Sequence, residues 1–220
     1  MEKRNIILGS YHTAAYGWTL TSWSLSPAAE KTNYVEKVGG DGSWDMSAVL
    51  TDGIPTFSDR DLTATFELSE GTRQSRNAEI SRMTNLLHGL RVNIEIPDHQ
   101  GYYLVGKVYV TKEYSDEAHA AITVTATCEP WLYSSEETVV KLTAASTEKT
   151  ATLVNNGRRA MAPALTVTGS SVLLKYGSNS LNMVAGQYQW PDLLLTPGRH
   201  EIKYSGSGSL TITYREAVLE

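Results

Sequence analysis

An alternation of apolar and polar residues with a period of two recurs along this chain and constrains its fold more than any other feature. Leu62, Ala64, Phe66 and Leu68 share one face of a segment whose intervening residues are threonine and glutamate. Successive side chains of a β-strand point to opposite sides, so this pattern is typical of a strand with one buried face. The alternation is also present in the segments 102–112, 120–128, 172–176, 200–204 and 210–214. It predicts a mainly β protein.

One segment, 74–88, departs from this period. Its apolar residues recur at the spacing of one helical face: Ile80, Met83 and Leu87. Thr72 and Ser75 are candidate N-caps, and Gly89 is placed to end the helix in a left-handed conformation. Its charged residues are predicted to form a solvated face opposite the core: Arg73, Arg76, Glu79 and Arg82. One amphipathic helix is therefore expected between two groups of strands.

A domain boundary is predicted shortly after the sequence Cys128-Glu129-Pro130-Trp131. Proline cannot continue a sheet ladder, and the polar run 134–137 (SSEE) is unsuited to a core. These signals divide the chain into an N-terminal domain, 1–133, and a C-terminal domain, 134–220. Because the second half consists of short apolar segments separated by turn formers, it is predicted to be a β-sandwich. The segment 205–209 (SGSGS) is predicted to be a hairpin connection within it.

The composition excludes several classes of protein. The net charge is -5 and the 19 lysines and arginines are scattered, whereas nucleic-acid binding requires clustered cations. No run approaches about 18 apolar residues, so membrane insertion is not expected, and we expect a soluble protein made in a cytoplasm. The single cysteine, Cys128, excludes an internal disulfide and lies on the apolar face of its strand. It is predicted to be a core residue.

The sequence contains no pattern that predicts catalysis. The five histidines are dispersed, no Gly-x-Ser-x-Gly set is present, and adjacent acids such as Glu136 and Glu137 point to alternate faces of a strand and cannot flank one bond. Asp41 and Asp45 are similar to the start of a calcium loop but lack its later ligands. We therefore predict that the chain is not an enzyme and has no catalytic residues, metal site or cofactor.

Two groups of residues remain as candidate binding surfaces. Tyr188 and Trp190 could form an aromatic platform for a sugar, although Trp190 could equally close one end of a hydrophobic core. The glycine-rich stretch 39–53 could be an arm that contacts another subunit or a hairpin within its own domain. On the first reading, Asp41, Trp44 and Arg60 are predicted to lie at or near a contact between subunits.

The order of these segments resembles the distal tail protein family of long-tailed, siphovirus-type bacteriophages. The segments that carry the resemblance are 38–45 (VGGDGSWD), the strand 60–68, the helix, 102–110 (YYLVGKVYV), the exit 128–131 (CEPW) and the C-terminal stretch 197–215. The resemblance implies a tail-tube-like split β-barrel with one helix, followed by a galectin-like β-sandwich. It also implies a virion protein, made in the bacterial host, whose copies form a sixfold ring around a DNA channel.

In that family the ring is a hub between the tail tube and the tail tip or baseplate. The resemblance thus implies four kinds of partner: further copies of the chain, a tail-tube protein, a tail-tip protein and, as an additional candidate, a receptor-binding protein. Two alternatives remain open, a carbohydrate-binding module and another structural protein related to the tail tube. The first predicts a monomer that retains glycans, and the second predicts stacked tubes.

Overall fold

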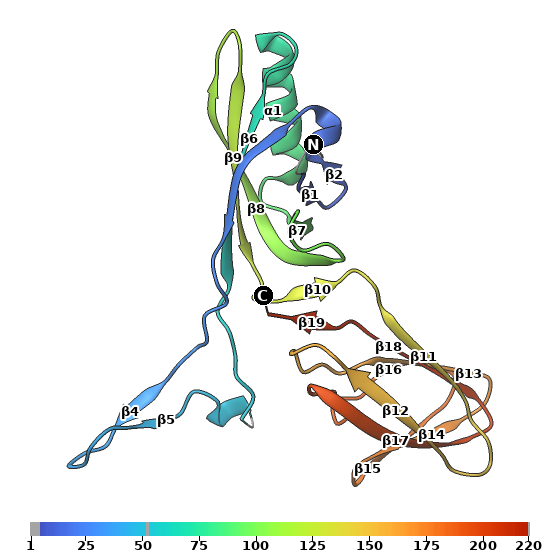
Figure 1. The fold of residues 1–220 in the computed structure, drawn as a ribbon. Coiled ribbons are helices and arrows are strands. Elements are labelled where there is room, and N and C mark those ends of the chain that lie inside the picture. The colour runs from blue at the N-terminus through green and yellow to red at the C-terminus, as the bar shows by residue number, and fades with distance from the viewer. Residues whose placement is uncertain (1–4, 52, 220) are drawn as a thin grey trace. The chain divides into compact units, whose positions relative to one another are not determined.

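The computed structural model describes residues 5–51 and 53–219, and the chain divides into two compact units. The first unit extends to Leu132, and the second comprises Tyr133–Leu219. Strands dominate both units, which confirms the predicted mainly β class (Figure 1). Each unit has its own arrangement of sheets.

The first unit is built on an antiparallel sheet with the strand order β2-β1-β7-β8-β9-β6-β3. Its strands are β1 (Ile7–Leu8), β2 (Tyr11–His12), β3 (Thr19–Leu25), β6 (Arg60–Leu68), β7 (Arg91–Glu95), β8 (Tyr102–Ser115) and β9 (Ala120–Cys128). A separate two-stranded sheet contains β4 (Tyr34–Glu36) and β5 (Ser43–Asp45), and two short 3-10 helices are η1 (Thr13–Tyr16) and η2 (Val49–Thr51). The larger sheet curls around one side of α1 (Arg73–Leu87) (Figure 1).

Strands β6, β8 and β9 follow the alternation expected from the sequence. Along β6 every second residue from Arg60 to Leu68 is buried, and Leu62, Ala64 and Phe66 contribute to the core. The register places Ala64 opposite Val124 of β9, which in turn lies opposite Val110 of β8. Rows of apolar side chains thus cross the sheet on the face that α1 covers.

The single α-helix among the described residues begins and ends as its sequence predicts. Thr72 is the N-cap, and its hydroxyl oxygen accepts a hydrogen bond from the Ser75 amide at 3.2 Å. Gly89, one residue beyond the C-cap, has a φ of +81°, the left-handed conformation that commonly ends a helix. Ile80, Met83 and Leu87 are buried against the sheet.

One part of the helix prediction was wrong, because Arg76 is not on the solvated face. Its side chain is only 1% exposed, and its guanidinium donates to the backbone oxygens of Gly71 and Asp116 at 2.6 and 2.9 Å. These two carbonyls lie where the chain enters the helix and where β8 ends. Burial is tolerated because backbone acceptors replace the water that the guanidinium loses.

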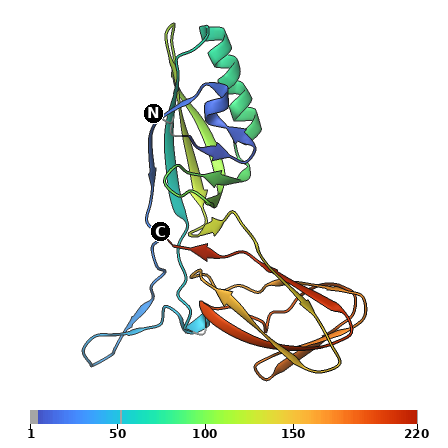
Figure 2. The same ribbon diagram turned by 45° about the vertical axis from the view of Figure 1, so that its right-hand side comes forward.

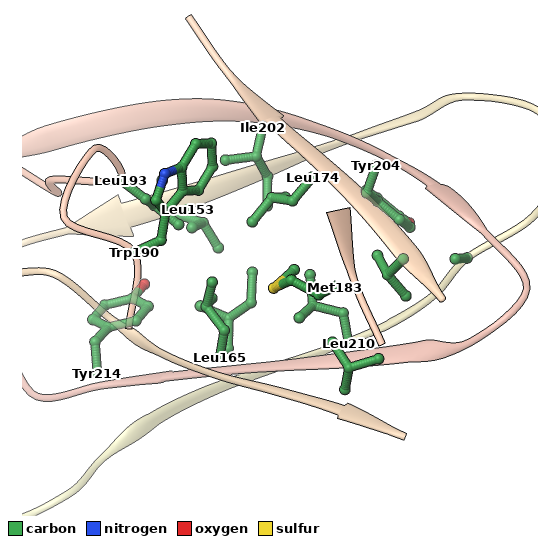
Figure 3. Close-up of a cluster of buried hydrophobic side chains, with 14 of the residues drawn as sticks. Leu153, Leu165, Leu174, Met183, Trp190, Leu193, Ile202, Tyr204, Leu210 and Tyr214 are labelled. Atoms are coloured by element: carbon green, nitrogen blue, oxygen red, sulfur yellow. The ribbon is translucent and has the colours of Figure 1, made fainter. Parts of the chain in front are cut away.

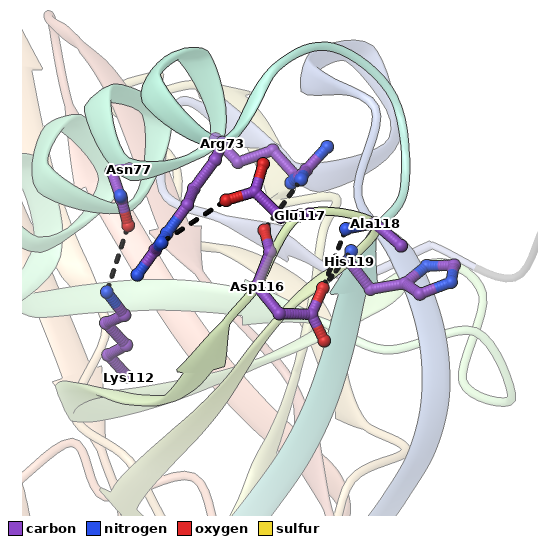
Figure 4. Close-up of polar contacts among 8 residues, drawn as sticks. Arg73, Asn77, Lys112, Asp116, Glu117, Ala118 and His119 are labelled. Atoms are coloured by element: carbon purple, nitrogen blue, oxygen red, sulfur yellow. Dashed lines mark hydrogen bonds and ion pairs between the residues drawn. The ribbon is translucent and has the colours of Figure 1, made fainter.

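The start of α1 contacts the turn between β8 and β9 through polar side chains (Figure 4). Arg73 forms an ion pair with Glu117 at 3.4 Å, and Lys112 donates to Asn77 at 2.9 Å. Within the turn the Asp116 carboxylate accepts hydrogen bonds from the amides of His119 and Ala118 at 2.7 and 2.8 Å. These amide donors lower the pKa of Asp116 below its usual value.

The second unit is a sandwich of two antiparallel four-stranded sheets. One sheet has the order β11-β18-β13-β16 and the other β12-β17-β14-β15. The strands are β11 (Thr138–Thr143), β12 (Lys149–Asn155), β13 (Ala164–Thr168), β14 (Val172–Tyr176), β15 (Asn179–Met183), β16 (Gly186–Gln189), β17 (Gly198–Gly206) and β18 (Ser209–Tyr214). The short strands β10 (Leu132–Ser134) and β19 (Ala217–Val218) pair with each other.

The space between these two sheets is filled with apolar side chains (Figure 3). Leu153 and Ile202 come from one sheet, and Leu165, Leu210 and Ile212 from the other, and each is at most 1% exposed. Inward residues from both sheets meet in one core, as the sandwich prediction requires.

The predicted hairpin at 205–209 was wrong. Strand β17 pairs with β12 and β14, whereas β18 pairs with β11 and β13, so the segment crosses from one sheet to the other. Alternation reports which side chains face the core, but both strands show the same pattern whichever sheet they join. The crossing requires glycine at position 206, because the Cβ of any other residue there would overlap the Ser171 carbonyl oxygen.

Candidate functional site

The residues between β3 and β6, 26–59, form a projection that we call the arm. Its hairpin of β4 and β5 is a sheet of its own and has no ladder to the larger sheet of the first unit. Figures 1 and 2 show this hairpin, in light blue, beyond the end of the β3–β6 pair. The hairpin is therefore connected to the larger sheet through the two chain segments that link it to β3 and β6.

The arm exposes an unusual amount of apolar surface. None of its described residues is buried, and Val38, Leu50 and Trp44 are 102%, 98% and 57% exposed. Seven of the fourteen large apolar residues found exposed in the described chain lie here: Tyr34, Val35, Val38, Trp44, Met46, Val49 and Leu50. A concentration of this kind is typical of a binding or association surface.

The arm also carries most of the net charge of the chain. Its sequence has two lysines and six acidic residues: Glu30, Glu36, Asp41, Asp45, Asp52 and Asp59. Six negative charges against two positive leave -4, while the whole chain has a net charge of -5. The acids are interspersed with the exposed apolar residues, so the surface is both apolar and acidic.

Two predicted interface residues, Asp41 and Trp44, lie on the arm. Asp41 is exposed in the turn between β4 and β5. Trp44 is on β5, and the Lys37 ammonium lies 6.0 Å from the centre of its ring. The structure therefore brings these two residues to one exposed hairpin.

Arg60, predicted beside them, lies apart from the hairpin and is completely buried. It is the first residue of β6, opposite Cys128 in the register with β9. Its Nε donates to the Ser26 backbone oxygen at 2.6 Å, at the point where the chain leaves β3. Arg60 thus joins the two ends of the arm and is not part of its exposed surface.

The segment at which the arm joins the sheet, 26–31 with 56–61, forms a ladder that we call the root. Ser26 and Asp61 exchange two hydrogen bonds, from the Ser26 amide to the Asp61 carbonyl at 2.9 Å and from the Asp61 amide to the Ser26 hydroxyl at 2.8 Å. The Ser58 amide donates to the Ala29 carbonyl at 2.8 Å, and Lys31 to Thr56 at 2.9 Å.

Phe57 attaches the root to the rest of the first unit. Its ring contacts Trp131 edge to face, with ring centres 5.4 Å apart and planes at 79°. The preferred geometry of aromatic pairs is of this kind. Phe57 was not predicted to have a role. A signal was present, because the chain has only two phenylalanines and this one stands outside any alternating strand.

The sheet face opposite α1 is rich in hydroxyl groups, and we call it the hydroxyl face. Neighbouring strands contribute residues in register: Ser22, Ser24, Thr63, Thr65, Thr111, Thr123, Thr125 and Thr127. All are exposed or half-buried, whereas the alternate residues of β6 and β9 are buried on the helix side. The centre of this face thus carries many hydroxyls and few charges.

The aromatic residues predicted as a sugar platform are not brought together on a surface. Trp190 is 6% exposed and belongs to the core of the sandwich, where its Nε1 donates to Asp192 at 3.1 Å (Figure 3). Tyr188 is half-buried, and its hydroxyl bonds to the backbone of Val184. In this arrangement the indole face of Trp190 is occupied by core contacts.

Groups that could carry chemistry are dispersed in the described chain. Between residues 5 and 219, apart from residue 52, no cluster of three or more His, Cys, Asp or Glu side chains could hold a metal. Cys128 is fully buried, and burial raises the pKa of its thiol to about 12. No helix within the described ranges is long and apolar enough to span a membrane.

The two units together have the fold of a hub protein of the phage adsorption apparatus. One similar solved structure is that of the SPP1 Dit (gp 19.1) protein, which is described as a paradigm of the hub adsorption apparatus in phages that infect Gram-positive hosts. The TM-score is 0.69 over 96% of this chain and 98% of that chain, at 14% sequence identity. No protein-family model and no curated protein matches the sequence. The likeness therefore establishes a shared fold.

Proposed function

We propose that this chain is a structural component of a phage tail, a distal tail protein whose copies form a ring-shaped hub between the tail tube and the tail tip. The observation that carries this proposal is the fold shared with SPP1 Dit across both units, not only one of them. A tube-like domain without the second sandwich would match over a smaller part of the chain. Its place is then the virion tail, after synthesis in the cytoplasm of the bacterial host.

The arm supplies the contact between copies. Its apolar residues gain little from packing within their own unit, so covering them with a second copy removes a large apolar area from water. Asp41 and Trp44 lie on that contact, and six copies close the ring. A closed ring uses one heterologous contact repeatedly and leaves no arm uncovered.

The hydroxyl face lines the passage of the ring. Threonine and serine side chains can interact with water and phosphate but do not hold a polyanion as clustered lysines or arginines do. DNA then slides through without sequence-specific binding. The remaining partners are a tail-tube protein on one side, a tail-tip protein on the other and a candidate receptor-binding protein, and no step of this function requires a catalytic group.

Assembly can be tested with substitutions on the arm. Trp44→Ala and Asp41→Ala are expected to shift purified protein from ring to monomer in analytical ultracentrifugation, with the larger effect for Trp44. The central aromatic residues of an interface commonly cost about 2 kcal/mol or more when truncated. Val184→Ala, at a site 63% exposed in the second unit, serves as the control and should leave the distribution unchanged. Unchanged sedimentation of both arm variants would reject this contact.

A further inference from the structure

We propose that Arg60 and Phe57 are positioning residues, which hold the root so that the arm leaves the first unit in one direction. Neither is expected to touch the second copy. Ring assembly depends on them because a pre-oriented arm docks at a lower entropic cost than a swinging one. This inference rests on the proposed function for its consequence, but the rigidity of the root is a property of a single chain.

Arg60 occupies a position where the pattern of the strand calls for an apolar residue. It shares the buried face of β6 with Leu62, Ala64 and Phe66, yet it carries a charge and is 0% exposed. A guanidinium is costly to bury unless it is hydrogen-bonded, and its Nε is bonded to the carbonyl of Ser26. The bond crosses from the first residue of β6 to the residue that follows β3, so it closes the arm at its base.

The neighbouring residues reinforce the same point. Ser26 and Asp61 exchange two hydrogen bonds, which include the Ser26 hydroxyl as acceptor. Beyond them the Ser58 and Lys31 amides continue the ladder along the root. Hydrogen bonds in the root thus join the arm to strand β6 of the larger sheet.

Phe57 supplies the other restraint. A ladder of two strands can still bend as a ribbon relative to the sheet, and a side contact is needed to stop that motion. The edge-to-face contact with Trp131 is such a restraint, because Trp131 lies just beyond the end of β9 in the same unit. The rest of the arm has no buried described residue that could fix its direction.

The direction of the arm can be measured in the single chain with two spin labels. Cysteines replace Glu36 on β4 and Thr63 on β6, both exposed, and labelled protein is diluted with unlabelled protein. Cys128 is buried, and the unsubstituted chain is used to verify that it takes up no label. Pulsed electron paramagnetic resonance should give one narrow distance distribution in this background.

Phe57→Ala and Arg60→Gln are then expected to broaden that distribution at least twofold, and Phe57→Tyr to restore it. Tyr16→Ala is the control, because it removes a ring pair with Tyr11, whose ring centres are 4.5 Å apart, near Leu68 at the end of β6 that is remote from the root. It should leave the width unchanged. Circular dichroism and the melting temperature identify any variant that fails to fold. If one of Phe57→Ala and Arg60→Gln does not fold, the distance distribution of the other tests the proposal.

Sedimentation of the same variants connects the root to assembly. Phe57→Ala is expected to raise the concentration for half-assembly of the ring at least tenfold while the monomer remains fully folded by circular dichroism. A broad distribution in the unsubstituted background, or an unchanged width in the folded variants, overturns the proposal. Broadening without any change in assembly also overturns it, since the arm would then dock equally well when free. If the parent chain forms no rings, either alone or with its partner proteins, the proposed function fails, while the spin-label result still decides whether the root is rigid.

Discussion

Cys128 shows how a single residue depends on its neighbours in a packed row. It lies between Arg60 of β6 and Gly106 of β8 in the register of the sheet, and its side chain is fully buried. An added Cβ at Gly106 would stand 2.6 Å from its sulfur, so glycine there makes space for the thiol. Burial opposes ionisation and outweighs the nearby Arg60 guanidinium, which favours the thiolate.

The raised pKa of this thiol predicts a loss of stability in alkali. In the unfolded chain the thiol ionises near its usual pKa of 9.0, whereas in the folded chain it stays protonated up to about 12. Its contribution is complete below pH 9 and is lost as the pH rises toward 12. Urea unfolding should show that stability falls more steeply for the native chain than for Cys128→Ala, by up to about 1.4 kcal/mol per pH unit. Equal slopes would contradict the burial of a neutral thiol.

At the scale of elements, the positions of the strands and the helix could be predicted from the sequence, but the hydrogen-bond partners of several side chains could not. The alternation in 62–68 and the helical spacing of Ile80, Met83 and Leu87 both reflect which side chains leave water, and the structure follows them. Arg60 and Arg76 were assigned by residue type to surfaces. Both are buried because backbone carbonyls at segment ends accept their hydrogen bonds, and no local pattern identifies such distant acceptors.

The extent of the arm and the crossing between the sheets could not be predicted from the sequence, for the same reason. The glycine-rich sequence indicated a turn near residues 39–42, but the exposure of the whole segment 26–59 depends on its lack of a ladder to the main sheet. Likewise, β17 and β18 would show the same alternation whether they paired in one sheet or belonged to two different sheets. Pairing between strands is a long-range property, which single-sequence periodicity does not determine.

The crossing between the sheets makes a specific demand on Gly206. Its φ is +135°, and an added Cβ would overlap the Ser171 carbonyl oxygen. Gly206→Ala is therefore expected to destabilise the second unit by about 3 kcal/mol or more in urea unfolding. Gly177→Ala is the comparison, because φ is +57° there and nothing lies within 4 Å of the added atom. It should cost about 1–2 kcal/mol. Equal losses of stability in the two variants would contradict the close contact between Gly206 and Ser171 at the sheet crossing.

At the scale of the whole molecule, the proposed function assigns different tasks to the two units. The first unit carries the arm and the hydroxyl face, which serve self-association and passage in the proposed hub. The second unit is a sandwich with a well-filled core, and in the proposed hub its outer surfaces contact other tail proteins. The acidic, apolar character of the arm contrasts with a net charge of -1 for the rest of the chain, the difference between -5 and -4. The proposed function depends above all on self-association through the arm.

Electron microscopy of the purified chain, alone and together with the products of neighbouring genes, tests that property most directly. The account predicts rings of six copies with a central hole, in which the arm of each copy lies on its neighbour and the hydroxyl face borders the hole. Solitary particles under both conditions, or closed assemblies whose arms project freely into solvent, would contradict it.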